Sequence, residues 1–324
     1  MTAVLGIDVA KATYQATLLV EGHSYKRSFG NHESAFPELL KWLHKHYTGQ
    51  LLVGMEATGR YWEALAYYLH EQGHVVSVIN PSRISYFARS KLVRNKTDAI
   101  DATLIAEYCL SQQPDPWTPP PAEVRELQAL VRHLEALQAL RTQQSNRLQA
   151  APPSCDVRAS LESLLSHLHD QIRAIESKIR EHIDQHPTLK QQSALLQSIP
   201  GIGQITAARL LGENIQQFDS TRALTAYAGL TPRHKISGTS VHGRPHLCKT
   251  GNEHLRRDLY FPAIVAMRYN PAVNSFSQRL SERGKPKMAV VGAAMRKLLA
   301  IALGVLKSNT PFDPCYSERN LVLN

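Results

Sequence analysis

A proline-rich segment, QPDPWTPPP at residues 113–121, separates two parts of this 324-residue chain whose apolar residues follow different periods. Before it, short β-rich runs alternate with runs at helical spacing. After it, leucine and isoleucine recur every three or four residues over long stretches. The sequence therefore predicts an α/β domain at 1–115, an antiparallel coiled-coil hairpin at 116–189 and a mainly helical domain at 190–324.

The pattern of the first part predicts a mixed sheet. Three β-rich runs, AVLGIDVA, TYQATLLV and HSYKRSF, follow one another across short turns and indicate a meander. Two further strands, LLVGMEA and VVSVINP, each come after a helical pattern. Ser34 is expected to cap the first of these helices and Gly73 to close the second. Such alternation favours parallel pairing with crossover helices, so both strand orientations belong to one sheet.

The second part begins with two long helical patterns separated by APPS at residues 151–154. Their apolar positions are Leu127, Leu130, Leu134 and Leu137, then Leu161, Leu165, Leu168, Ile172, Ile175, Ile179 and Ile183. These helices indicate a spacer or dimerisation arm, or alternatively two helices packed on the core of one domain. Further on, SIPGIG is typical of a helix-hairpin-helix turn, in which Gly201 and Gly203 let backbone N–H groups approach a DNA phosphate. A purely structural tight turn would use the same residues.

The formal net charge of +10 is concentrated near the end of the chain. Lys and Arg number 11 against 10 Asp and Glu in residues 1–110, 9 against 10 in 111–190, and 17 against 7 in 191–324. A local excess of this kind suits a polyanion, because each cation set against a phosphate releases condensed counterions. Basic surface kept for solubility is the alternative.

Four acidic residues predict a metal site in the first part. Asp8 ends the first predicted strand and Glu56 ends LLVGMEA, so both carboxylates can emerge at one end of the sheet. Asp98 and Asp101 are three apart, which places them on one side of a helix. Together they could hold two Mg²⁺ ions. Taken singly, each acid could instead be a turn or helix-capping residue.

Basic residues and a serine add to this picture. Residues 82–96 contain five cations and no acid, and among them Arg94 and Lys96 could bind a nucleic-acid backbone next to the acidic site. The basic, glycine-broken stretch at 229–260 carries Ser237, which could attack a phosphate or simply cap a turn. The spacing of the nearby His242, His246, Cys248 and His254 matches no standard zinc pattern.

The blocks GIDVAK, GMEATGRYW, VINPSRISYFARS, RNKTDAIDA, SIPGIG, GLTP, SG-x-S and KTGNEHLRR occur in this order. Together they resemble the DEDD-type insertion-sequence transposases related to the Piv and MooV recombinases, which are guided by a bridge RNA. The resemblance covers nearly the whole chain. It implies an RNase H-like (RuvC-like) N-terminal domain, a coiled-coil segment and a C-terminal transposase domain.

The same resemblance implies roles for individual residues. Asp8, Glu56, Asp98 and Asp101 correspond to the Mg²⁺-binding tetrad, and Ser237, unlike Ser240, corresponds to a nucleophile that forms a phosphoserine link to DNA. Donor and target DNA, a non-coding guide RNA and a homodimer or homotetramer are the implied partners. Further nucleic-acid contacts are expected from Arg233, Lys249, Arg256 and Arg257.

Other functions stay open at this point. A structure-selective nuclease of RuvC type would use water as its nucleophile, and a protein that only binds nucleic acid would need none of the four acids. An actin-like or sugar-kinase ATPase is disfavoured, because the chain has no G-x-x-x-x-G-K-[ST] loop. We expect a cytoplasmic bacterial protein, nucleoid-associated when active and independent of a membrane, since no apolar run approaches about 20 residues.

Overall fold

The computed structural model describes residues 3–57, 59–92, 98–151, 155–237 and 241–315. The chain forms two compact units, Met1–Pro119 and Pro120–Asn324. The proline-rich segment mostly belongs to the first unit, since Trp117 N donates a hydrogen bond to Val76 O and the Trp117 ring contacts Trp62 and Tyr67 edge-on.

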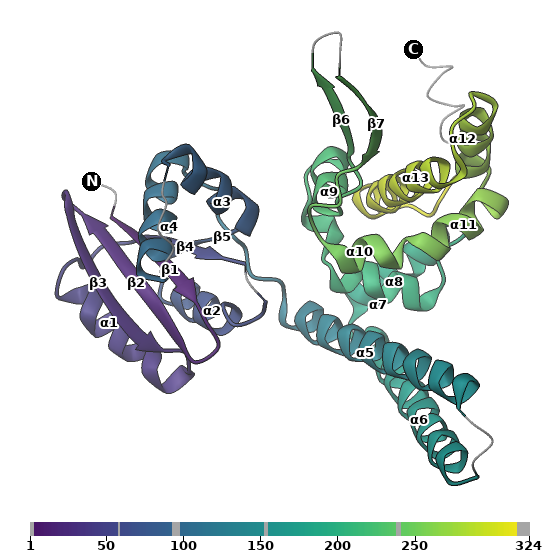
Figure 1. Cartoon of the computed structure of the whole chain (residues 1–324), viewed down its shortest axis with the longest axis horizontal. Helices are drawn as coiled ribbons and strands as arrows, with labels where there is room; N and C mark the ends of the chain where they lie inside the picture. The colour runs from purple at the N-terminus through teal and green to yellow at the C-terminus, as the bar shows by residue number, and fades with distance from the viewer. Residues whose placement is uncertain (1–2, 58, 93–97, 152–154, 238–240, 316–324) are drawn as a thin grey trace. The chain divides into compact units, whose positions relative to one another are not determined.

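The first unit contains the predicted mixed sheet (Figure 1). Its strands are β1 (Val4–Val9), β2 (Thr13–Val20), β3 (His23–Gly30), β4 (Leu52–Glu56) and β5 (Val75–Ile79). They are ordered β3-β2-β1-β4-β5. The pairs β1–β2 and β2–β3 are antiparallel, whereas β1–β4 and β4–β5 are parallel. The prediction of a meander continued by parallel crossovers is confirmed.

Helices cover both faces of this sheet (Figure 1). On one face, α1 (Phe36–His44) and α2 (Glu63–Glu71) pack on strand residues such as Ile7 and Met55. On the other face lie α3 (Pro81–Ser90) and α4 (Asp98–Gln112). Alternate strand residues face opposite sides of the sheet. The odd-numbered residues of β1 therefore pack against α1 and α2, and the even-numbered ones face α4.

The expected cap at Ser34 is wrong. A short 3₁₀ turn, Glu33–Ala35, precedes α1, which begins at Phe36 with Pro37 in its first turn. Proline is favoured at this position because its fixed φ suits the start of a helix. An N–H group there would have no partner within the helix, so its absence costs nothing. Ser34 instead contacts the ring of His32, with 2.8 Å between its Oγ and Nδ1.

Two glycines allow α4 to lie directly on the sheet. Gly6 of β1 and Gly54 of β4 are paired neighbours. A Cβ added at Gly6 would lie 2.2 Å from Ala102 O, and one at Gly54 would lie 2.2 Å from Cys109 Sγ. Any side chain at these positions would push the helix away from the strands.

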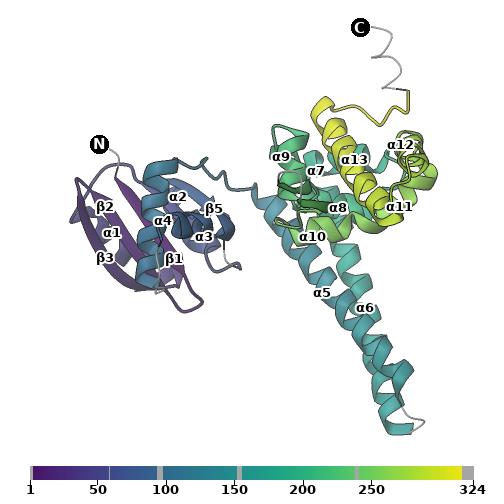
Figure 2. The ribbon, with the colours of Figure 1, turned by 45° about the horizontal axis from the view of Figure 1, so that its top comes forward.

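The second unit is mainly helical, with its apolar residues in one large cluster. Its helices are α5 (Ala122–Ala150), α6 (Cys155–Gln185), α7 (Pro187–Gln197), α8 (Gln204–Gly212), α9 (Thr221–Tyr227), α10 (Glu253–Asp258), α11 (Tyr260–Tyr269), α12 (Pro271–Glu282) and α13 (Lys287–Ser308), with a 3₁₀ turn, Ile215–Gln217. Figure 2 shows α5 and α6 side by side as a helical hairpin. Residues near its base, such as Leu127 and Ile179, join the common core, so the hairpin extends the unit and also forms part of it.

Two features of the second unit differ from the sequence-based expectations. Within the part expected to be mainly helical, the basic, glycine-broken stretch forms an antiparallel hairpin of β6 (Pro232–Ser237) and β7 (Val241–Leu247), joined to the unit near α9 (Figure 1). Also, α13 is long and apolar enough to span a membrane by length and composition, with a mean hydropathy of 1.9 over its best window. Half of that window is buried, and Leu298, Leu299 and Leu303 belong to the core, which accounts for its apolar character.

Replacing Gly6 with Ala should destabilise the first unit by about 1 to 3 kcal/mol, because the new methyl group overlaps the backbone of α4. Chemical denaturation followed by circular dichroism measures the change. Gly304→Ala in α13 is the control, since its Cβ would meet no atom within 4 Å. Equal stability of the Gly6→Ala and wild-type proteins would contradict the close approach of α4.

Candidate active site

Asp8 and Glu56 lie together at the carboxyl ends of two neighbouring parallel strands. The β1–β4 register pairs Gly6 with Gly54 and Ile7 with Met55, so the next position sets Asp8 beside Glu56. Each acid is two residues beyond a glycine that faces α4, and the period of two therefore places both on the α4 face. Both are partly exposed, as a site open to substrate requires.

Helix α4 begins at the same end of the sheet. After its last turn the chain passes the first half of β5, where Ser77 Oγ donates to Pro114 O at 3.1 Å and Trp117 N donates to Val76 O at 2.7 Å. The end of α4 therefore lies toward the starts of the parallel strands, and its beginning lies toward their carboxyl ends. Figure 2 shows α4 crossing the sheet in this way.

The predicted aspartates occupy the first turns of α4. Asp98 opens the helix, although its side chain lies outside the described part of the structure. Asp101 is partly exposed and precedes Ile105, which packs on the sheet, by about one helical turn. Elements far apart in sequence thus bring Asp8, Glu56 and Asp101 to one end and one face. Within the described residues no group of three or more His, Cys, Asp or Glu is arranged to hold a metal ion.

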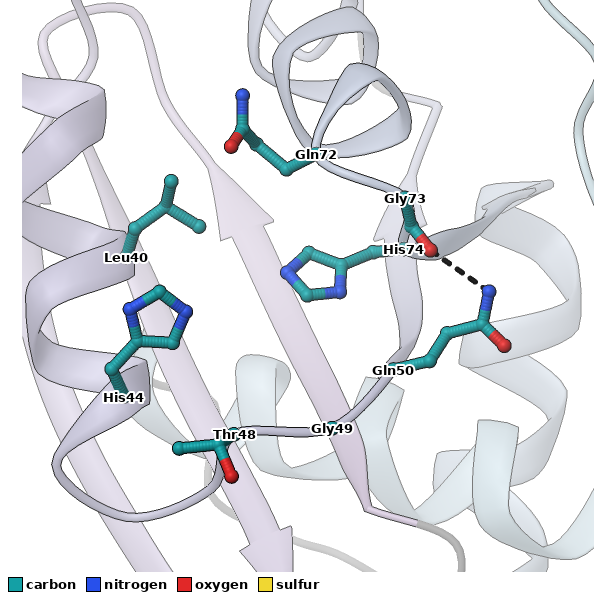
Figure 3. A pocket seen from close by; sticks show the side chains of 8 residues that line it. All are labelled: Leu40, His44, Thr48, Gly49, Gln50, Gln72, Gly73 and His74. Carbon is teal, nitrogen blue, oxygen red and sulfur yellow. Dashed lines mark hydrogen bonds between the residues drawn. The ribbon is translucent and has the colours of Figure 1, made fainter.

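One pocket of the first unit lies at the other end of the sheet, where the parallel strands begin (Figure 3). It is lined by residues that precede β4 and β5, among them Gln50 and His74, together with His44 of α1. Burial, and secondarily the neighbouring His44, lower the pKa of His74. This pocket is therefore distinct from the carboxylate site.

Basic and aromatic residues lie along α3, which starts at the carboxyl end of β5. Asn80 caps the helix by accepting a hydrogen bond from Ser82 N at 2.9 Å. Tyr86 is exposed, and the Arg89 guanidinium lies 5.9 Å from the centre of its ring. Lys91 pairs with Glu107 of α4. The predicted contacts Arg94 and Lys96 lie outside the described residues.

In the second unit, the SIPGIG turn joins α7 to α8. Gly201 has a φ of 105°, and a Cβ there would lie 2.8 Å from that of Ala266 in α11, so packing requires this glycine. Gly203 is exposed at the N-cap of α8, with no atom within 4 Å of an added Cβ. Phosphate binding by this turn remains a prediction, with Gly203 as its accessible member.

Ser237 is the last residue of β6 and pairs with Val241 of β7, while its side chain lies outside the described part. Three of the predicted basic residues, Arg233, Lys249 and Arg256, lie near the base of this hairpin. Hydrogen bonds from Thr250 lower the pKa of Cys248, and the charges of Arg233 and Arg256 add to this effect. Arg233 of β6 and Arg256 of α10 therefore both lie near enough to Cys248 for their charges to act on its thiol.

A polar cluster built around the buried carboxylates Glu135, Glu213 and Asp258, which the sequence did not reveal, joins α5 to α8 and α10. It comprises Arg132, Glu135 and Gln138 of α5, Arg209 and Glu213 at α8, and Asn252, His254, Arg257 and Asp258 at α10. Glu135 Oε2 lies 2.8 Å from Arg257 Nη2 and 2.9 Å from His254 Nδ1. Arg209 lies 2.9 Å from Asp258 Oδ1. Arg257, which the sequence predicts to contact DNA, therefore forms an ion pair with Glu135.

Two family models match this chain, and the first extends across the border between the two units. Residues 5–151 match the DEDD transposase family of IS110 elements, and residues 193–278 match the transposase family described as IS116/IS110/IS902. The chain is 35% identical over 316 residues to the pilin gene-inverting protein of Moraxella bovis, covering 95% of this chain and 97% of the relative.

A second relative covers less of the chain. An uncharacterized 43.6 kDa protein of insertion element IS110 from Streptomyces coelicolor is 34% identical over 157 residues, or 48% of this chain and 37% of the relative. These matches define a DNA-recombining enzyme of the transposase class, a class that works with a divalent metal. The chain belongs to the IS110 family of transposases.

The polar cluster should make the stability of the second unit depend on pH. Burial raises the pKa of Asp258 from 3.8 to about 6, with Glu135 adding to the rise and Arg209 opposing it. A protonated Asp258 can donate to Glu135 Oε1, which otherwise has no hydrogen-bond partner among the described residues. Because the folded state holds this proton more tightly, the stabilisation is complete below about pH 4 and lost as pH rises through about 6.

We therefore expect the stability of the wild-type protein, relative to Asp258→Asn, to fall between pH 4 and 6.5. The asparagine amide can donate to Glu135 at every pH, so this variant lacks the transition. Urea denaturation across that range measures the difference, and Asp219→Asn, an exposed site, is the matched control. Parallel pH profiles for the wild-type and Asp258→Asn proteins would refute the assignment.

Proposed function

We propose that this chain is an RNA-guided DNA recombinase that cleaves and rejoins strands with a carboxylate-bound metal and a serine nucleophile. The proposal rests above all on Asp8 and Glu56, which share one end and one face of the sheet with the start of α4. The strand order and the parallel β1–β4 pair support an RNase H-like, RuvC-like fold for the first unit.

The donor set fits a hard divalent cation. Asp8, Glu56, Asp98 and Asp101 would hold Mg²⁺, because carboxylate oxygens are its preferred protein ligands. When bound, the metal would supply positive charge against the oxygens of the scissile phosphate. The strand ends and the first turns of α4 are rigid elements, which favours a pre-organised site.

The second unit would supply the nucleophile. The Ser237 hydroxyl attacks the scissile phosphorus, a new Ser–O–P bond forms, and a deoxyribose oxygen leaves with a proton. The phosphodiester energy is retained in the phosphoserine ester, so a second deoxyribose hydroxyl can displace the serine and reseal the strand without ATP. A nuclease that uses water cannot reseal in this way.

Two relationships support the finer parts of the proposal. The Moraxella relative is named for inverting a pilin gene, so inversion of a DNA segment is a reaction to test for this chain. The resemblance of its motifs to bridge-RNA-guided recombinases supports a guide RNA as the source of target specificity. The lysine and arginine excess in residues 191–324 would serve both nucleic acids.

Asp8→Asn and Glu56→Gln should lower recombination of a plasmid carrying donor and target sites by about 10²-fold or more, because each change removes charge where it opposes the phosphate. Glu71→Gln, on exposed surface at the end of α2, is the matched control and should keep wild-type activity. Full activity in both site variants would overturn the metal-site proposal.

Ser237→Ala should abolish the covalent protein–DNA adduct, whereas Ser240→Ala should retain it. Adducts are trapped by denaturation and detected by gel shift of labelled DNA. Cleavage without any adduct in the wild-type protein would support a water-using nuclease in place of the serine mechanism.

Sequencing the RNA that copurifies with the protein tests the guide separately. If no RNA encoded beside the gene copurifies, RNA guidance is contradicted.

A further inference from the structure

Two segments flank the β6–β7 hairpin, residues 227–231 before it and residues 248–252 after it. They are hydrogen-bonded to each other, and we call this pair of segments the frame. Cys248 N donates to Thr231 O at 2.9 Å, Lys249 N donates to Gly229 O at 3.1 Å, and Asn252 N donates to Tyr227 O at 2.6 Å. Both strands of the hairpin leave directly from this frame. Its geometry therefore determines where the strand that ends at Ser237 begins.

Two glycines make the frame possible. A Cβ at Gly251 would lie 2.2 Å from Tyr227 O, and one at Gly229 would lie 3.0 Å from Thr250 O. Both have positive φ, 135° at Gly251 and 66° at Gly229, which other residues rarely adopt. The motifs GLTP and KTGN thus contain the glycines that let the two segments approach.

One buried carboxylate fastens the frame to the rest of the unit. Glu213, directly after α8, accepts a hydrogen bond from the Asn252 amide, and its Oε2 lies 3.5 Å from the Tyr227 hydroxyl. The Asn252 amide also donates to the Tyr227 hydroxyl at 2.9 Å. Its Oδ1 caps α10 by accepting from Leu255 N at 3.0 Å. Both segments of the frame therefore meet at Glu213.

The charge of Glu213 is balanced from the helical hairpin. Arg132 of α5 pairs with the other oxygen of this carboxylate, Oε1, and also lies 3.3 Å from Glu135. The Glu213 side chain is only 5% exposed, so the carboxylate depends on these partners. The contacts extend from α5 through Glu213 to the frame and on to β6.

We propose that Glu213 is a positioning residue for the DNA-cleaving serine, acting through Asn252 and Tyr227. It does not touch the DNA; it holds the hairpin so that Ser237 is aligned with the scissile phosphate. This inference rests on the proposed serine mechanism. Small displacements of a nucleophile are costly, about 10²-fold in rate for roughly 1 Å, so loss of this anchor should slow the chemistry more than the binding.

The test exchanges the roles of the two partners. Asn252→Asp keeps a capping oxygen for α10 but sets a second carboxylate against Glu213, and should slow adduct formation by about 10²-fold. In the double variant Glu213→Gln with Asn252→Asp, the amide at position 213 can donate to the carboxylate at position 252. This restores one donor facing one acceptor, with the roles of the two positions exchanged, and should recover most of the rate. Glu253→Gln, an exposed acid next to Asn252, is the matched control and should match the wild-type rate.

Thermal unfolding and DNA affinity are measured for each variant beside the rate of adduct formation. The inference holds if Asn252→Asp stays folded at the assay temperature and binds DNA much like the wild type but loses adduct rate, and the double variant regains it. It fails if Asn252→Asp keeps the wild-type rate. It also fails if rate, affinity and stability fall together without rescue, since that indicates a general structural role. If the wild type itself forms no Ser237-dependent adduct, the proposed function has failed, which is a separate result.

Discussion

The contact of α4 with β1 and β4 is the constraint on which the first unit depends. At Gly6 the backbone of α4 rests directly on the strand, and at Gly54 the Cys109 and Ile105 side chains of α4 fill the space that a Cβ would take. A bulkier pair at this level would separate the start of α4 from the strand ends. The spatial relation of Asp101 to Asp8 and Glu56 therefore rests on two residues that carry no functional group.

In the second unit, buried polar contacts fix the relative positions of helices, as the glycines Gly6 and Gly54 do for α4 in the first unit. The apolar cluster fixes the general packing of the helices, but such packing tolerates small shifts. The buried carboxylates Glu135, Glu213 and Asp258 each require specific partners, because an unpaired buried charge is costly. These requirements select one arrangement of α5 against α8 and α10, and with it one position for the base of the β6–β7 hairpin.

Much of the fold follows from sequence periodicity. The strands of the first unit, their mixed orientation and the long helices after residue 121 all appear as apolar patterns that local physics explains. The cap at Ser34 was wrong because Pro37 favours a later helix start. The β6–β7 hairpin was missed because a basic, glycine-containing stretch lacks the apolar alternation of a half-buried strand.

The candidate site was predictable only in part. Asp8 and Glu56 could be placed at strand ends, since parallel strands bring such positions together. The polar cluster could not be found, because Arg132 and Glu213, or Glu135 and Arg257, are far apart in sequence and each resembles an ordinary surface charge. Only the GLTP and KTGN glycines gave a signal, and their spacing does not reveal that the two segments touch.

The helical hairpin of α5 and α6 has a mechanical consequence. Near its base, residues such as Leu134 and Ile175 are buried in the common core, whereas beyond Leu137 the buried positions of α5 thin out to Gln144. The free energy that holds the two outer ends together is therefore local and small compared with that of the whole unit. The outer part of the described hairpin is therefore expected to open at a lower free-energy cost than its base.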